Sequence, residues 1–208
     1  MKRGSFPLFV YPNYWCNFQC SYCFTHSSNG MAEDTFVIRN WREILSQAIE
    51  AGITEIRLAG GEPLALTRFH EMITDVYELQ LPYTVTTNGT YIKKQQATLA
   101  DMPPTDLWIS FHPEHMPKSS FLKILEFASN SFPSNLGANV FEEDMRLFDF
   151  DTTELAQVGA SRIKVLEKTN IGRHKFGTRV ALTDRQLAKI AKTSRQRQIE
   201  CRIEGIRN

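Results

Sequence analysis

The stretch TEIRLAGGEPL, residues 54–64, decides how this chain folds. It begins with a short run in which apolar residues alternate with polar ones, a pattern typical of a β-strand. Two glycines and a proline then interrupt the run, as at the turn that follows a strand. A helical pattern occupies residues 67–80. The stretch therefore predicts one unit made of a strand followed by a helix.

The same unit recurs along the 208 residues of the chain. The helix expected over 40–51, for example, places Trp41, Leu45 and Ala48 on one apolar stripe. A final helix begins at Thr183 or Asp184. We expect further strands at residues 6–12, 83–89, 105–112, 136–142 and 161–168, a short last strand at 199–204, and helices at 92–100, 119–129 and 151–158.

This alternation predicts a parallel α/β fold with right-handed crossovers. An eight-unit barrel takes about 250 residues, so the chain fits a partial TIM-type (β/α)6 barrel better. A doubly wound open sheet is the alternative. Both architectures place functional groups at the carboxyl ends of the strands. We expect one domain over residues 1–208, which ends in a basic helix and tail at 180–208.

Charge is distributed unevenly along the chain. Residues 1–160 carry 11 Lys and Arg against 19 Asp and Glu, whereas residues 161–208 carry 13 against 4. Such a basic segment suits an anionic substrate, a nucleic acid or an acidic partner, although a solvated helix face would look the same. No apolar run has the length of a membrane span or a signal peptide. We therefore expect a cytoplasmic protein without a membrane partner.

The cysteines are concentrated in the stretch YWCNFQCSYCFTH, residues 14–26, which holds three of the four in the chain. Clustered cysteines of this kind favour metal ligation over a disulfide framework. Zinc and iron–sulfur clusters both take thiolates and both complete four positions. Either His26 is the fourth ligand of a zinc ion, or Cys16, Cys20 and Cys23 hold a four-iron cluster with one iron left open.

The spacing CxxxCxxC, followed by Gly60-Gly61-Glu62-Pro63, resembles the paired motifs of the radical S-adenosylmethionine (SAM) enzyme superfamily. The resemblance covers about residues 6–175 and implies a core of six strand–helix units. It implies a [4Fe–4S] cluster on the three cysteines, with the amino and carboxylate groups of SAM on the open iron. Reductive cleavage of SAM would then give a 5′-deoxyadenosyl radical that abstracts a hydrogen from the substrate.

The resemblance also suggests which residues contact SAM. Gly60 and Gly61 allow the backbone to approach a ligand, Glu62 offers acceptors to an ammonium group, and Pro63 stiffens the loop. Each of these features also suits an ordinary turn. Further cofactor-binding candidates, most of them at the ends of the expected strands, are Tyr22, Asn88, Ser110 and Asn139.

Candidate substrate-binding residues follow strands four and six. His112 ends the expected strand four, where a loop with Glu114 and His115 begins; these groups suit acid–base chemistry or substrate contact, or belong to a plain surface loop. Lys168, Arg173 and Lys175 form a basic loop that we expect to attract a phosphate or carboxylate.

These features predict a minimal, single-cluster radical SAM enzyme acting on a small nucleotide- or sugar-like molecule, either anionic or neutral. Cys201, the one remaining cysteine, cannot build a second cluster. An external electron donor of the flavodoxin or ferredoxin type is therefore expected, and beyond the basic segment nothing indicates nucleic acid. The alternatives are a peptide- or protein-modifying member, including a glycyl-radical activase, and, from another class, a zinc-stabilised binding module.

Overall fold

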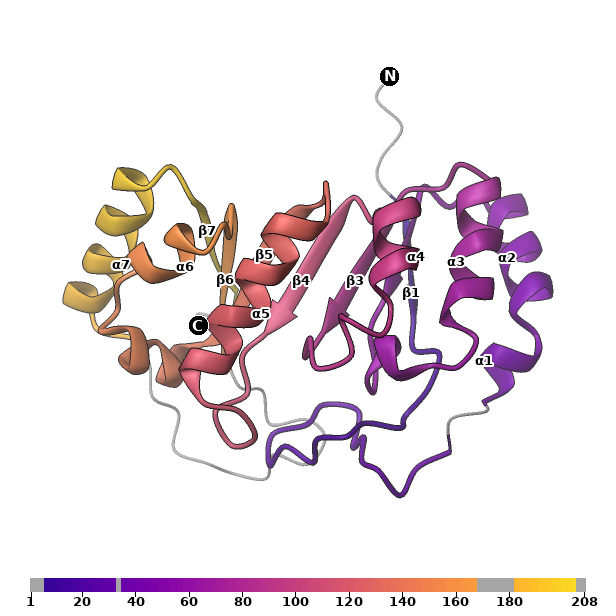
Figure 1. Cartoon of the computed structure of the whole chain (residues 1–208), viewed down its shortest axis with the longest axis horizontal. Coiled ribbons are helices and arrows are strands. Elements are labelled where there is room, and N and C mark those ends of the chain that lie inside the picture. The colour runs from indigo at the N-terminus through magenta and orange to yellow at the C-terminus, as the bar shows by residue number, and fades with distance from the viewer. Residues whose placement is uncertain (1–5, 33–34, 168–181, 205–208) are drawn as a thin grey trace.

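The computed structural model describes residues 6–32, 35–167 and 182–204, and within them the chain forms one parallel β-sheet. Seven strands lie side by side in chain order (Figure 1). They are β1 (Pro7–Val10), β2 (Glu55–Leu58), β3 (Tyr83–Thr87), β4 (Asp106–Ser110), β5 (Asn135–Phe141), β6 (Arg162–Leu166) and β7 (Glu200–Glu204).

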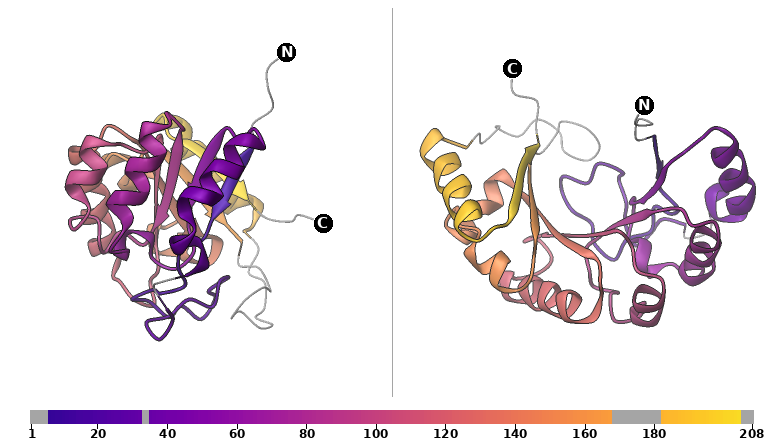
Figure 2. Two further views of the ribbon diagram at one scale, coloured as in Figure 1. Left: turned by 90° about the vertical axis from the view of Figure 1, so that its right-hand side faces the viewer. Right: turned by 90° about the horizontal axis from the view of Figure 1, so that it is seen from above.

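The helices cover one face of this sheet, which curves like part of a barrel wall (Figure 2). In a doubly wound fold the strand order reverses and helices cover both faces. Neither occurs in the described residues, so that alternative is wrong and the partial TIM-type barrel is confirmed. The helices are α1 (Phe36–Arg39), α2 (Trp41–Glu50), α3 (Phe69–Glu78), α4 (Gln96–Asp101), α5 (Lys118–Ser131), α6 (Thr153–Gln157) and α7 (Asp184–Gln196).

The core lies between the sheet and its helices. Ile56, Leu58, Ile163 and Val165 are buried there, as every second residue of a strand should be when one face is covered. The intervening residues, such as Lys164, face the concave side. The strands thus carry an apolar face under the helices, whereas the face inside the curve combines polar residues with aromatic ones such as Trp108, which packs against Lys164.

Several segments differ from the prediction, among them the short helix α1, which was not expected. The helix expected over 92–100 begins only at Gln96, and two 3₁₀ segments, η1 (Pro63–Ala65) and η2 (Glu142–Phe148), were not expected. Such short turns carry no helical periodicity that a sequence pattern can show. The capping of α7 follows the prediction, because the Thr183 hydroxyl accepts from the Gln186 N–H in a capping box.

The segment that follows β1, residues 11–32, is called the cysteine loop below. It crosses the carboxyl ends of the strands, at the lower side of Figure 1. The structure contains, in the residues that it describes, no helix long and apolar enough to cross a membrane.

Candidate functional site

A cavity of about 280 Å³ opens between the cysteine loop and the carboxyl ends of the strands. It collects residues that lie far apart in the sequence. Of the candidates named from the sequence, its lining includes Cys16, Cys20, Tyr22, Cys23, Gly60, Gly61, Glu62, Asn88, Ser110 and His112.

The two glycines after β2 hold the cysteine loop against the sheet. Gly60 has a φ of 114°, which side chains other than hydrogen rarely allow. A Cβ atom on Gly61 would lie 2.1 Å from the Trp15 carbonyl oxygen. This close approach permits the Gly61 N–H to donate to Asn13 O at 3.1 Å and the Glu62 N–H to donate to Trp15 O at 2.8 Å. The backbone that approaches this turn closely is therefore that of the cysteine loop. Gly60 and Gly61 are needed for this packing as well as for the expected approach of a ligand.

Glu62 is buried, with 1% of its surface exposed. Its Oε1 accepts from Leu64 N at 3.0 Å and from the Thr87 hydroxyl at 2.5 Å, and its Oε2 accepts from Asn88 N at 2.8 Å. Burial nevertheless raises the pKa of the carboxyl to about 7. Glu62, which was expected to accept from an ammonium group, thus already accepts from three donors of the protein. Its hydrogen bonds join the turn after β2 to the end of β3.

Asn88 joins the end of β3 to the cysteine loop. Its Nδ2 donates to Asn17 Oδ1 at 3.0 Å and lies 3.8 Å from the Cys16 sulfur. Its Oδ1 accepts from the N–H and the hydroxyl of Thr90, as in a local Asx turn. Asn88 thus forms a local turn and contacts the cysteine loop at the same time.

The three cysteine side chains have environments suited to metal binding. Cys16 Sγ accepts from Phe18 N at 3.4 Å, and Cys23 Sγ accepts from Ser27 N at 3.2 Å. Burial raises the pKa of Cys16 to about 11 and that of Cys20 to about 12. These thiols keep their protons at neutral pH, so metal binding must release the protons.

The spacing of the cysteines separates the two metal hypotheses. A zinc ion holds sulfur at about 2.3 Å, which leaves neighbouring sulfurs about 3.8 Å apart. In the described part of the chain, the His, Cys, Asp and Glu ligand atoms found within 4.8 Å of one another belong to Cys20, Glu114 and His115. The three cysteines therefore do not gather around one ion, and His26 is exposed and outside the cavity lining. Three thiolates spread around a cavity fit a larger iron–sulfur cluster.

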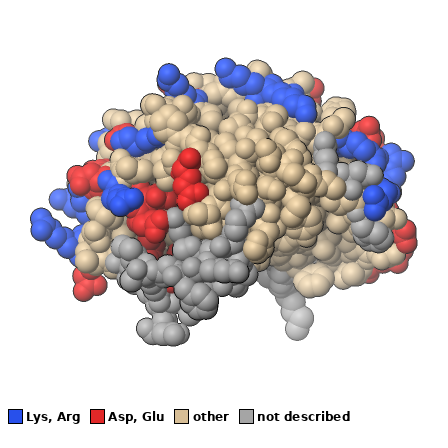
Figure 3. Space-filling model, turned by 90° about the horizontal axis from the view of Figure 1, so that it is seen from below, with Lys and Arg blue, Asp and Glu red and all other residues tan. Residues whose placement is uncertain are grey.

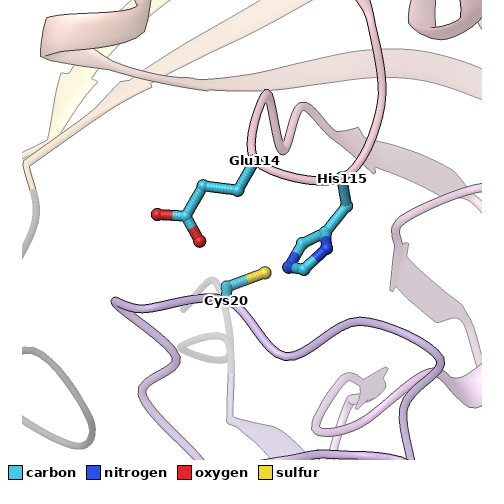
Figure 4. Close-up of side chains that lie close together, drawn as sticks. All are labelled: Cys20, Glu114 and His115. Atoms are coloured by element: carbon cyan, nitrogen blue, oxygen red, sulfur yellow. The ribbon is translucent and has the colours of Figure 1, made fainter.

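The loop between β4 and α5 meets the cysteine loop from the other side. Figure 4 shows Glu114 and His115 pointing toward Cys20. Glu114 Oε2 accepts from Ser21 N at 2.8 Å, and its other oxygen accepts from the Ser21 hydroxyl. His112 Nδ1 lies 3.6 Å from the Cys20 sulfur. The predicted loop histidines and Glu114 thus contact the cysteine loop.

Some candidates lie away from the cavity. Pro63 is buried in η1, and Asn139 reaches the cavity only through Ser110, whose hydroxyl accepts from its Nδ2 at 3.1 Å. Lys168, Arg173 and Lys175 fall outside the described residues. The sequence reasoning did not name these lining residues: Tyr11, Thr25, Ser27 and Phe141. Phe141 ends β5, so the strand-end rule would have found it, whereas Thr25 and Ser27 carry no such signal.

The family profile of the radical SAM superfamily matches residues 10–133, more than half of the chain. The chain belongs to this superfamily. It is an enzyme of the radical SAM class, and the predicted cofactors, a [4Fe–4S] cluster and SAM, are confirmed. The alternative of a zinc-stabilised binding module is therefore wrong.

Curated relatives of this radical SAM enzyme include two GTP 3′,8-cyclases. The one from Synechocystis is 29% identical over 191 residues, covering 84% of this chain and 58% of the relative. The one from Nautilia profundicola is 38% identical over 91 residues, covering 41% of this chain and 28% of the relative. This chain thus spans little more than half the length of the Synechocystis relative.

Two solved structures share the fold. SuiB from Streptococcus suis, bound to S-adenosylmethionine, matches with a TM-score of 0.78 at 20% identity, over 97% of this chain and 51% of SuiB. HydG, a maturase of the [FeFe]-hydrogenase, matches with a TM-score of 0.64 at 16% identity, over 98% of this chain and 52% of HydG. At these identities the likeness concerns the fold alone.

Proposed function

We propose that Cys16, Cys20 and Cys23 hold the cluster and that SAM occupies the cavity beside them. The observation that carries this proposal is the common cavity, which is lined by the three cysteines and by the ends of β2, β3 and β4. Together, the bound cluster and SAM supply a 5′-deoxyadenosyl radical for hydrogen abstraction. The chain's own residues position both groups and keep water from them.

Each strand end contributes to this positioning. The turn after β2 fixes the base of the cysteine loop, Asn88 fixes the segment around Cys16, and Glu114 fixes the segment between Cys20 and Cys23. Phe18 and Tyr22 pack against the loop after β4 and exclude solvent from that side. These contacts restrain the cysteine loop from three directions, which favours a fixed ligand geometry.

We further propose a small, anionic, nucleotide-like substrate. Support comes from the GTP 3′,8-cyclase relatives and from the concave face of the sheet next to the cavity. There Lys164 lies opposite Asn139 in the register of β5 and β6, and its ammonium group is 4.1 Å from the centre of the Trp108 ring. The Trp108 ring is buried and also holds the Arg162 guanidinium at 5.3 Å, so it positions two cations that suit the phosphate of such a substrate.

The charges around Lys164 support the same conclusion. Burial lowers the pKa of Lys164, Glu204 raises it in part, and the nearby Arg57, Arg202 and Arg162 lower it further. Its carboxylate neighbour, Glu204, lies at 3.9 Å, whereas Arg202 approaches Glu200 to 2.7 Å. An anionic ligand group near Lys164 would therefore relieve repulsion among these cations.

The reduced cluster needs an electron, and we propose a flavodoxin or ferredoxin as its donor. The donor would dock at the end of the molecule that carries the cysteine loop. Figure 3 shows this end, where uncharged residues cover much of the described surface and Lys and Arg lie mainly at the edges. Phe24, an exposed aromatic residue on the cysteine loop, lines the cavity and offers an apolar contact there.

Metal analysis after anaerobic purification and reconstitution tests the cofactor assignment. We expect about four iron and four sulfide per chain, as one such cluster requires. One zinc per chain without iron would contradict it. Equilibrium dialysis with GTP tests the substrate class, and a chain that binds GTP no better than guanosine would contradict an anionic nucleotide-like substrate.

A further inference from the structure

His112 begins the loop after β4 and lies against the second cysteine of the motif. Its Nδ1 is 3.6 Å from the Cys20 sulfur and 3.0 Å from the Tyr22 hydroxyl, which also hydrogen-bonds to that sulfur. The Tyr22 ring lies nearly parallel to the imidazole, at 17°, and Phe18 meets the imidazole edge-on. These aromatic contacts fix the orientation of the imidazole.

The backbone that carries His112 is fixed as well. Glu114 accepts from the N–H and the hydroxyl of Ser21, and His115 stacks on Phe18 with ring centres 4.7 Å apart. Figure 4 shows how Glu114 and His115 reach across to Cys20. The loop after β4 is therefore attached to the cysteine loop on both sides of Cys20, so the distance from His112 to the sulfur is set by several contacts.

We propose that His112 is a positioning residue that donates a hydrogen bond to the Cys20 sulfur, together with the Tyr22 hydroxyl, and thereby raises the reduction potential of the cluster. This inference rests on the proposed function, in which Cys20 is a cluster ligand. A ligating thiolate has no proton and can only accept, so the Tyr22 hydroxyl donates to the sulfur, and the single Nδ1–H of His112 is shared between the Tyr22 oxygen and the sulfur. Donors at a cluster sulfur stabilise the reduced, more negative cluster, which raises its potential.

The test is an EPR-monitored redox titration of the reconstituted full chain. His112→Leu removes the donor, and we expect an equilibrium constant for cluster reduction about tenfold lower, which is about 59 mV for a one-electron couple. His112→Asn keeps an N–H donor close to the position of Nδ1, so its potential should stay near that of the wild type. Tyr22→Phe should lower the potential in the same direction as His112→Leu.

His26→Asn is the matched control, because His26 is an exposed histidine of the cysteine loop that does not line the cavity, and Asn tolerates its φ of 56°. Its potential should not change. Full iron loading with an unchanged potential in His112→Leu would overturn the proposal. Should His112→Leu fail to load iron, an unchanged potential in Tyr22→Phe would overturn it instead. A wild-type chain without a cluster would contradict the proposed function, which is a separate outcome.

Discussion

Replacing Gly61 by alanine should loosen the cysteine loop from the sheet. The added Cβ would lie 2.1 Å from the oxygen and 2.8 Å from the carbon of the Trp15 carbonyl, and backbone cannot rotate away as a side chain can. Overpacking costs about 1–3 kcal/mol. The shift would also weaken two backbone hydrogen bonds, each contributing about 1 kcal/mol. We therefore expect the free energy of unfolding to fall by about 4 kcal/mol.

Urea denaturation of the metal-free chain measures this loss, and iron analysis after reconstitution measures its consequence for the site. Gly30→Ala is the matched control, because Gly30 lies in the same loop and its Cβ would meet one side-chain atom at 4.0 Å. The control should change stability by less than about 1 kcal/mol and should bind iron as the wild type does. Equal stability and equal iron loading in Gly61→Ala and Gly30→Ala would refute the reasoning.

Three further predictions concern single side chains. Since burial raises the pKa of Glu62 from 4.5 to about 7, the folded state binds that proton more tightly, and the free energy of unfolding should fall by about 3 kcal/mol as pH rises through this range. In Glu62→Gln, the free energy of unfolding, measured by urea titration at several pH values, should not show this fall. The same pH dependence as in the wild type would contradict the raised pKa of Glu62. Cys201→Ala should retain about four iron per chain, because Cys201 lies on β7 away from the cavity lining. Lys164→Gln should weaken GTP binding about tenfold, whereas Lys189→Gln, which removes an exposed ion pair on α7, should not; equal affinities would exclude Lys164 from the site.

Sequence patterns predict strands such as β2 and β6 well because these strands bury every second residue under a helix. The last strand, residues 199–204, follows the same rule: Cys201 and Ile203 pack against the core, and Arg202 between them is exposed. The 3₁₀ segment η2 escapes prediction because its buried residues, among them Met145 and Phe148, lie in a short turn without a repeating period.

The candidate site is predicted where one motif supplies several residues and is missed where distant loops meet. The cysteine spacing and the glycine turn indicate the cavity directly. The contact between Ser21 and Glu114 joins residues 93 positions apart, and no local pattern encodes it. The role of Gly61 is similarly hidden, because its close neighbour Trp15 belongs to another strand's loop.

Single-turnover cleavage of SAM tests the central claim most directly. Anaerobically reconstituted chain is mixed with SAM and a strong reductant, and 5′-deoxyadenosine is measured for the wild type and for Cys20→Ala. If Cys16, Cys20 and Cys23 hold the cluster next to SAM, the wild type should form 5′-deoxyadenosine and Cys20→Ala should form none. Equal formation by the two proteins would contradict the account.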